Sequence, residues 1–286
     1  MKGKIIKIVS NQYTVIDEKN ERYVCAVKGN VRKQKLMAVG DNVQIDFVDQ
    51  QPLIVDIDER KNHLIRPSIA NVDQALIVMS TKDPDFSTVL VDQLSFLINH
   101  AGIVPVLCIT KMDLVEKDDH LYEIIEDYRK SGIQVILTHK DEIESIIPYI
   151  QGKVTVLTGQ SGAGKSSLIN RLNPDFQLAT QEISKALGRG KHTTRHCELH
   201  EIYGGWVADT PGFSSLDFSK MSVEELNASV SEFEPYLGKC RFRDCIHQNE
   251  PGCAVKEAVN EGKVSKIRYK NYVEVLKQIQ NRRVKY

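Results

Sequence analysis

The sequence lacks any long apolar run. No stretch of about 18 consecutive apolar residues, the length that a membrane-spanning helix needs, occurs among the 286 residues. The first ten residues carry spaced lysines and lack the apolar segment and cleavage site of a secretory signal. We therefore expect a cytoplasmic protein with no membrane association.

An excess of one charge is also absent, because 38 Lys and Arg balance 38 Asp and Glu. The balance is uneven along the chain. Residues 1–65 carry 11 basic and 9 acidic side chains, and residues 254–286 carry 9 and 3. Basic ends around an acidic centre suggest contact with a polyanion, although a solvated basic helix at the C-terminus would explain the charge equally well.

Residues 1–65 are predicted to form a small β-barrel. Five short segments rich in Val and Ile are separated by turn residues such as Gly40-Asp41, and this spacing is typical of a barrel. The connection from Lys28 to Lys35 holds four basic side chains, including Arg32 and Lys33. A basic loop on such a barrel favours an OB-fold that binds nucleic acid; an SH3-like barrel with a solvated loop is the alternative.

Residues 66–216, which begin at Arg66-Pro67, alternate between strand and helix patterns. Apolar runs at 74–79, 104–109, 133–137 and 154–157 are separated by helical patterns at 89–100 and 121–130. This alternation predicts a parallel sheet with helices on its faces. Residues 197–208, with Gly204-Gly205 at the turn, resemble an added hairpin. Residues 217–286 show no strand pattern and predict a helical domain, whose first helix Ser222 and Glu225 would cap.

The segment from Gly159 to Ser166 fits the P-loop pattern in full, and it follows a predicted strand and opens a predicted helix at 166–172. The glycines let backbone N–H groups surround phosphate oxygens. Lys165 would reach the β- and γ-phosphates, and the Ser166 hydroxyl would ligate Mg²⁺.

Thr110-Lys111-Met112-Asp113 follows an apolar strand and is expected to select the base. The Asp113 carboxylate can accept two hydrogen bonds from guanine, and adenine offers no matching pair of donors. Asn is usual at the first position, so Thr110 offers one donor fewer to brace the loop. Thr138, after the next strand, is a weaker candidate for contact with the base.

Two further segments complete the expected nucleotide site. In Asp209-Thr210-Pro211-Gly212, Asp209 would hold Mg²⁺ through water and Gly212 would meet the γ-phosphate. The polar segment 188–195 lacks periodicity, so we expect a mobile loop in which Thr194, or else Thr193, completes the Mg²⁺ shell. The nucleotide-binding residues predicted from all these segments are Thr110, Lys111, Met112, Asp113, Thr138, Gly159, Gln160, Ser161, Gly162, Ala163, Gly164, Lys165, Ser166, Ser167, Asp209 and Gly212.

The order of these segments indicates a circular permutation. The base-selecting loop of an ordinary small GTPase follows its P-loop, but here Asp113 precedes Gly159. The same sheet can form if the old termini are joined and the chain is opened elsewhere. The segment 209–212 then leads directly into the C-terminal domain, so movement at Gly212 would be transmitted there.

Three of the six cysteines gather with a histidine within 14 residues: Cys240, Cys245, His247 and Cys253. Four N and S ligands describe a closed, tetrahedral, structural zinc site rather than a catalytic one. Free thiols beside a chance histidine are the alternative. The other three, Cys25, Cys108 and Cys197, are expected to be packing residues.

The combination of a barrel, a permuted GTPase and a Cys/His module resembles the bacterial ribosome small-subunit-dependent GTPase A (RsgA) family over nearly the whole chain. The resemblance implies an OB-fold, contact with 16S rRNA of the 30S subunit, a role in late 30S maturation, and GTP hydrolysis stimulated by that subunit. We also expect a monomer, with GTP and Mg²⁺ at the P-loop and one structural Zn²⁺ at the Cys/His residues.

Phe213 stands where ordinary GTPases carry a water-orienting Gln after the 209–212 segment. The resemblance suggests His192, on the mobile loop, as the catalytic substitute beside Lys165, although a solvated histidine remains the alternative. Two other functions stay open: an RNA-binding adaptor in which nucleotide is a structural ligand, and a metabolic ATPase or kinase, against which Asp113 argues.

Overall fold

The computed structural model describes residues 1–29, 31, 36–65, 67–139, 142, 144–172, 197–208, 213 and 216–282. The chain separates into two compact units. The first consists of residues 1–75, 146–157 and 166–212, and the second of residues 76–145, 158–165 and 213–286. No helix among the described ranges is long and apolar enough to cross a bilayer.

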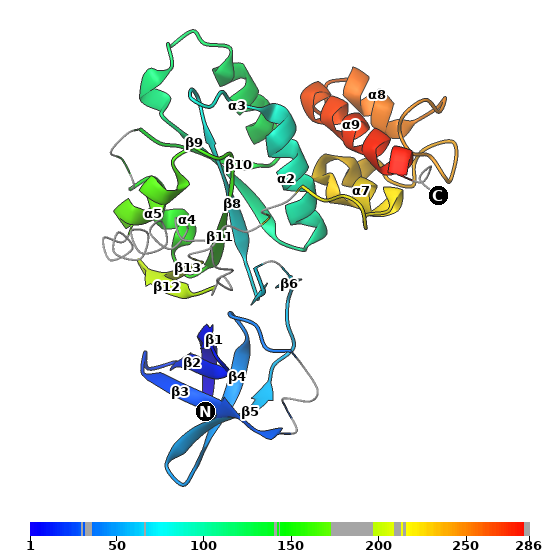
Figure 1. Cartoon of the computed structure of the whole chain (residues 1–286). Helices are drawn as coiled ribbons and strands as arrows, with labels where there is room; N and C mark the ends of the chain where they lie inside the picture. The colour runs from blue at the N-terminus through cyan, green and yellow to red at the C-terminus, as the bar shows by residue number, and fades with distance from the viewer. Residues whose placement is uncertain are drawn as a thin grey trace. The chain divides into compact units, whose positions relative to one another are not determined.

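Five strands of the first unit close into a barrel (Figure 1). The order around the barrel is β1-β2-β3-β5-β4, and the pairing of β3 with β5 is parallel while the others are antiparallel. Alternate residues point inward, as in a strand with one buried face, so that Ile5, Val15, Cys25 and Ile54 meet in the core. The expected OB-type barrel is confirmed. Its strands are β1 (Lys2–Val9), β2 (Gln12–Asp17), β3 (Arg22–Val27), β4 (Asn42–Val48) and β5 (Gln51–Ile57).

The first compact unit contains two further short strands after the barrel strands. Strands β6 (His63–Leu64) and β7 (Ile69–Ala70) pair with each other, and the Ala70 N–H donates to the Val39 carbonyl at 2.8 Å. Ile69, Ala70 and Val72 are fully buried. These two short strands have no periodic signal in the sequence. Together with the barrel strands they belong to the first compact unit, whose first segment ends at Ala75.

The α/β part has a six-stranded sheet in the order β10-β9-β8-β11-β13-β12. Pairing is parallel between β10 and β9 and between β11 and β13, whereas β12 and β13 form the expected antiparallel hairpin. Every residue of β8 is buried, in keeping with a sheet covered on both faces. The strands are β8 (Gln74–Ser80), β9 (Val104–Thr110), β10 (Gln134–Leu137), β11 (Val154–Gly159), β12 (Leu199–Ile202) and β13 (Gly205–Ala208); the helices are α2 (Thr88–His100), η1 (Met112–Leu114), α3 (Leu121–Lys130), α4 (Ile147–Ile150) and α5 (Lys165–Leu172).

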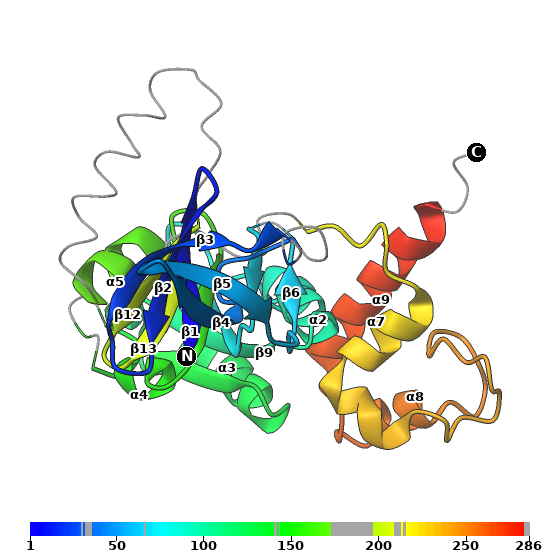
Figure 2. The same ribbon diagram turned by 90° about the horizontal axis from the view of Figure 1, so that it is seen from below.

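The C-terminal region is helical, as expected (Figure 2). Helix α2 contributes Phe96 to an apolar core that it shares with Phe233, Tyr272 and their neighbours. The long terminal helix, α9, begins at Lys266, and a shorter helix, α8, precedes it. The elements are α7 (Val223–Ser229), η2 (Ser231–Tyr236), α8 (Ala254–Asn260) and α9 (Lys266–Arg282).

The predicted capping box of α7 is present. The Ser222 hydroxyl accepts from the Glu225 N–H at 3.1 Å, and the Glu225 carboxylate accepts from the Ser222 N–H at 2.8 Å. We expect Ser222→Ala to lower the free energy of local opening of α7 by about 1 kcal/mol, because an orphan N–H loses its partner. Hydrogen exchange of the α7 amides measures this change. As a control, Ser219→Ala removes an exposed hydroxyl outside the cap and should leave the exchange rates unchanged. If Ser222→Ala also exchanged at the wild-type rate, the role of the cap would be contradicted.

Candidate nucleotide and metal sites

The P-loop connects the end of β11 to the start of α5. Gly159 has a φ of +117°, and a Cβ at this position would lie 2.1 Å from the carbonyl oxygen of Val78. Only glycine can therefore occupy the position, because both the backbone conformation and the contact with β8 exclude a side chain. The Gln160 N–H donates to the same Val78 oxygen at 3.2 Å, so the loop begins tightly packed against β8.

Lys165 turns back into the loop that precedes it. Its Nζ donates to the carbonyl oxygens of Gly159 at 2.9 Å and Gln160 at 2.5 Å. Burial lowers the pKa of the Lys165 ammonium, since desolvation disfavours its charge. The negative charge of a phosphate chain held by this loop would favour the charged ammonium and so raise the pKa of Lys165 again. The remaining predicted loop residues follow one another along the chain: Ser161 and Gly162 are exposed, Ala163 is buried, Gly164 is half-buried, and Ser166 and Ser167 are exposed in the first turn of α5.

Thr110 joins the base-selecting loop to the P-loop. Its hydroxyl lies 2.8 Å from the carbonyl oxygen of Ala163 and 3.3 Å from that of Met79. A hydroxyl has one hydrogen to donate, and the shorter distance assigns it to Ala163. Thr110 therefore braces the two loops with a single donor although it replaces the usual Asn.

Lys111 adopts a left-handed conformation, with a φ of +61°. Its Nζ donates to the carbonyl oxygens of Lys82 at 2.7 Å and Asp83 at 2.6 Å, and its own carbonyl accepts from the Thr81 hydroxyl at 2.9 Å. The stem of the side chain is thereby held between fixed ends, where it can lie along the plane of a base.

The carboxylate of Asp113 is exposed in the short helix η1 and can accept from a guanine. The position of η1 depends on backbone bonds: the Met112 N–H donates to the Thr138 carbonyl at 3.2 Å, and the Thr138 N–H donates to the Ile109 carbonyl at 2.9 Å. The Thr138 side chain is buried, with its hydroxyl 3.4 Å from the Ile109 oxygen. Thr138 thus supports the loop through its backbone.

The loop between β8 and α2, residues 81–87, belongs to this site and was not predicted. In addition to the bonds from Lys111, its Asp85 carbonyl accepts from the Gln160 side chain at 2.9 Å. Its composition carries no motif. Its position could have indicated it, because the loops after the carboxyl ends of adjacent parallel strands form the ligand crevice of such sheets.

Several predicted residues lie outside the described part of the chain: His192, Thr193, Thr194, Asp209 and Gly212, as well as Arg32 and Lys33 of the barrel loop. Of the proposed Mg²⁺ ligands, only Ser166 is therefore placed. Phe213 is described; it is half-buried, with a φ of +53°.

The predicted Cys/His residues come together in one cluster, with His247, Cys245 and Cys253 buried and Cys240 half-buried. The Nδ1 atom of His247 lies 3.5 Å from the sulfurs of Cys240 and Cys245 and 3.4 Å from that of Cys253, and the Cys240 and Cys253 sulfurs are 3.9 Å apart. Zinc bonds of about 2.3 Å to sulfur and about 2.0 Å to nitrogen give tetrahedral edges of about 3.8 Å between sulfurs and about 3.5 Å from sulfur to nitrogen. The cluster therefore fits one tetrahedral zinc ion.

The surrounding chain holds the cluster in shape. The Glu250 carboxylate accepts from the backbone N–H groups of Ile246, Gln248 and Asn249 at 2.9–3.0 Å. These bonds lower the pKa of Glu250, although its burial opposes them. Two tyrosine hydroxyls of α9 donate to this turn, Tyr269 to the His247 carbonyl at 2.8 Å and Tyr272 to the Ile246 carbonyl at 2.7 Å. Helix α9 is thus tied directly to the metal-binding turn.

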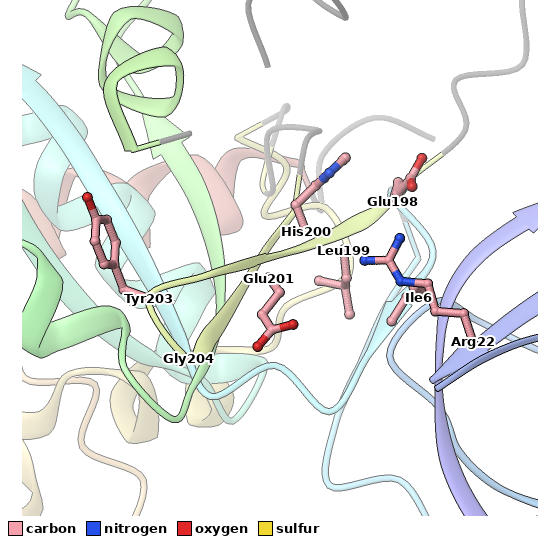
Figure 3. Close-up of a pocket in the computed structure, with 8 residues that line it drawn as sticks. All are labelled: Ile6, Arg22, Glu198, Leu199, His200, Glu201, Tyr203 and Gly204. Carbon is pink, nitrogen blue, oxygen red and sulfur yellow. The ribbon is translucent and has the colours of Figure 1, made fainter. Parts of the chain in front are cut away.

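A polar pocket of about 460 Å³ lies beside β12 (Figure 3). Arg22 extends from β3 toward Glu198, and His200 and Glu201 line the pocket from β12. Lys7 of β1 forms an ion pair with Glu198 at 2.6 Å. Charges of both signs face the pocket, so its chemistry favours no single class of ligand.

Comparisons with known proteins agree with this architecture. Residues 57–219 match the family model of the RsgA GTPase, and residues 2–53 match that of the RsgA N-terminal domain. The small ribosomal subunit biogenesis GTPase RsgA of Bacillus subtilis is 46% identical over 99% of each chain. This chain belongs to the RsgA GTPase family. Listeria monocytogenes has an RsgA that is 44% identical over the full length of both chains.

Two solved structures share the fold of this RsgA-family chain. YloQ, described as a circularly permuted GTPase, is 42% identical with a TM-score of 0.87, covering 100% of this chain and 96% of its own. YjeQ from Thermotoga maritima is 35% identical with a TM-score of 0.84, covering 98% of each chain. The permuted order predicted from Asp113 and Gly159 is therefore confirmed, and the chain is a GTP-hydrolysing P-loop enzyme.

The contact between Thr110 and Ala163 leads to a prediction about GTP affinity. Thr110→Val keeps the shape of the side chain but leaves the Ala163 carbonyl without its donor, which costs about 1–3 kcal/mol. We expect the affinity for GTP to fall roughly tenfold, since about 1.4 kcal/mol corresponds to that factor. Titration with a fluorescent GTP analogue measures it. Thr110→Ser retains the hydroxyl and serves as the control; equal affinity of the Val and Ser variants would exclude the bracing role.

The cluster geometry predicts one zinc ion per chain. Protein purified without chelators should contain it, and Cys245→Ser should lower the zinc content, because a closed site needs all four ligands. Elemental analysis gives the stoichiometry. Cys25→Ala changes a buried cysteine of the barrel core and should keep the zinc. Native protein without zinc would show that the cluster holds free thiols.

Proposed function

We propose that this chain acts as a GTPase in the biogenesis of the small ribosomal subunit. The observation that carries the proposal is the likeness over 99% of the chain to relatives whose name states that role. A likeness of that extent includes the barrel, the GTPase domain and the Cys/His cluster together. The proposed functional division is 1–65 for the barrel, 66–216 for the GTPase domain and 217–286 for the zinc-binding domain.

Within the GTPase domain, we propose that Asp113 selects guanine while Lys111 lies along the base. The P-loop from Gly159 to Ser166, together with Ser167, binds the phosphates, with the Lys165 ammonium on the β- and γ-phosphates and Gly212 at the γ-phosphate. The proposed Mg²⁺ ligands are Ser166, Thr194 and Asp209, of which Asp209 acts through water. The ion supplies charge neutralisation to the transferring phosphoryl group when it is bound.

We propose that the zinc ion is structural, because all four of its positions are taken by protein ligands. It would hold the turn from Cys240 to Cys253 against α9, to which Tyr269 and Tyr272 already attach it. The chain's own contribution to the chemistry then comes from the nucleotide site alone.

The proposed macromolecular partner is the 30S subunit, through its 16S rRNA. Support comes from the basic connection that begins at Lys28 and from the C-terminal segment 254–286, which carries nine basic and three acidic side chains. Clustered Lys and Arg bind phosphates without reading sequence. We propose that the protein works as a monomer in the cytoplasm, where ribosomal subunits are assembled.

Hydrolysis needs a group that orients water, and Phe213 cannot supply one. We propose that His192 takes this role when the 30S subunit orders the segment 188–195. Free protein would then hydrolyse GTP slowly.

The test measures GTP turnover with and without purified 30S subunits. Activators that complete a GTPase site elsewhere raise the rate roughly 10³- to 10⁵-fold, and we expect a substantial increase here. His192→Ala should retain GTP affinity and 30S binding but lose the stimulation. The matched control is His200→Ala, which changes the β12 histidine eight residues later in the sequence and should remain stimulated.

Each outcome has a separate meaning. Full stimulation of His192→Ala would remove this histidine from the mechanism but leave the ribosomal role intact. Equal turnover of the wild type with and without subunits would overturn activation. It would favour instead an RNA-binding adaptor in which nucleotide is a structural ligand.

A further inference from the structure

A buried cluster of charges joins α9 to α2. Arg268 of α9 and Asp92 of α2 are both fully buried. The Nε atom of Arg268 lies 3.2 Å from Asp92 Oδ1 and 3.3 Å from Glu232 Oε2 of η2. The guanidinium also donates through one Nη to the Ser95 hydroxyl of α2 at 3.3 Å. One cation is thus shared between two carboxylates inside the second compact unit.

Stability alone does not explain this cluster. Among the described residues, Nε and Nη1 of Arg268 find no hydrogen-bond partner, and neither do Asp92 Oδ1 and Glu232 Oε2. The charges are at ion-pair distance, but their hydrogens and lone pairs are not aligned. A buried ion pair offsets its desolvation only when its geometry is excellent and its remaining groups are bonded. Replacement of a buried ion pair by apolar side chains of similar volume is often neutral or stabilising.

The cluster does fix the position of α2. Besides its ion pair with Arg268, the Asp92 carboxylate accepts from the Asn271 amide of α9 at 2.6 Å. Burial raises the pKa of Asp92 to about 6, while Arg268 and Asn271 act in the opposite direction. The Tyr128 hydroxyl of α3 donates to the carbonyl of Thr88, the first residue of α2, at 3.3 Å. The N-terminal half of α2 is therefore attached to α9 and α3 at one point.

That half of α2 continues directly from the loop that faces the nucleotide site. The Ser87 hydroxyl caps α2 by accepting from the Leu90 N–H at 3.3 Å. Just before it, the carbonyls of Lys82 and Asp83 accept from Lys111, and that of Asp85 accepts from Gln160. A displacement of α2 would move these three acceptors away from the base-selecting loop and the P-loop.

We propose that Arg268 is a positioning residue for guanine-nucleotide binding. From the C-terminal helix it fixes α2, and through α2 it fixes the loop 81–85 that receives Lys111 and Gln160. The proposal rests on GTP binding at the P-loop and is independent of the ribosomal role. Because coupling between sites is reciprocal, GTP binding also stabilises the packing of α9 on α2.

The test compares three full-length variants by GTP affinity in the absence of ribosomes. Arg268→Met keeps the volume and removes the charge; we expect its Kd for a fluorescent GTP analogue to rise roughly fivefold or more, the usual lower range of coupling between sites. Asn271→Ala removes one bond to Asp92 but leaves the ion cluster, and should give a smaller rise in the same direction. Arg268→Lys restores the charge and should recover part of the affinity.

The matched control is Tyr272→Phe. Tyr272 is also fully buried on α9, but its hydroxyl bonds the Asn227 side chain and the Ile246 carbonyl, neither of which lies on α2. Its loss should lower thermal stability as much as that of Asn271 and leave the Kd unchanged. Zinc content should be the same in all variants.

Hydrogen exchange separates positioning from a general loss of stability. The backbone amides of the four non-proline residues in 81–85 should exchange faster in Arg268→Met and Asn271→Ala than in the wild type, and at the wild-type rate in Tyr272→Phe. If Arg268→Met does not fold, Asn271→Ala carries the test. Wild-type affinity and exchange in Asn271→Ala and Arg268→Met, or an equal rise in Kd for Tyr272→Phe, would overturn the proposal. Absence of GTP binding by the wild type would instead overturn the assignment of the nucleotide site.

Discussion

One hydrogen bond, from the Thr110 hydroxyl to the Ala163 carbonyl, holds together the two loops on which the nucleotide site depends. The P-loop can bind phosphates wherever it folds, and Asp113 can accept from guanine wherever it is exposed. A single nucleotide can meet both only if the loops keep a fixed separation. Thr110 sets that separation at the carboxyl ends of β9 and β11, and Lys111 and Gln160 extend it to the loop after β8.

The permuted order of the chain changes what each loop is connected to without changing the site. The base-selecting loop comes first and belongs to the strands that follow the barrel, and the segment 209–212 comes last and continues into the C-terminal helices. Hence the loop with Asp113 is connected to the C-terminal region by the packing of α2 on α9, while the segment with Gly212 is connected to it by the backbone. A displacement of the first loop can reach the C-terminal helices only through side-chain contacts, whereas a displacement of the second reaches them along the chain.

The sequence predicts the features whose residues lie close together along the chain. The P-loop occupies eight consecutive residues and the metal cluster fourteen, so spacing alone shows which atoms can meet. The barrel strands follow from alternation, and the sheet from its apolar runs. The loop 81–85 has no such signal, since its role lies in three carbonyl oxygens that every residue carries. Asn271 and Asp92 are 179 residues apart, and nothing in either segment indicates the other.

Thr110 shows a different limit of sequence reasoning. Replacing Asn by Thr removes a donor, and counting donors alone predicts a weaker brace. The structure places the Ala163 carbonyl within 2.8 Å of the hydroxyl, so one short, well-placed donor performs the task. The buried cluster around Arg268 presents the opposite case, in which many polar groups meet but few align. Well-aligned bonds occur at Thr110, which joins two loops, and within the turn that Glu250 stabilises. Around Arg268 the ion pairs of 3.2 and 3.3 Å are joined by the Asn271 bond to Asp92 at 2.6 Å, so α2 is held on α9 by several contacts together rather than by one aligned bond.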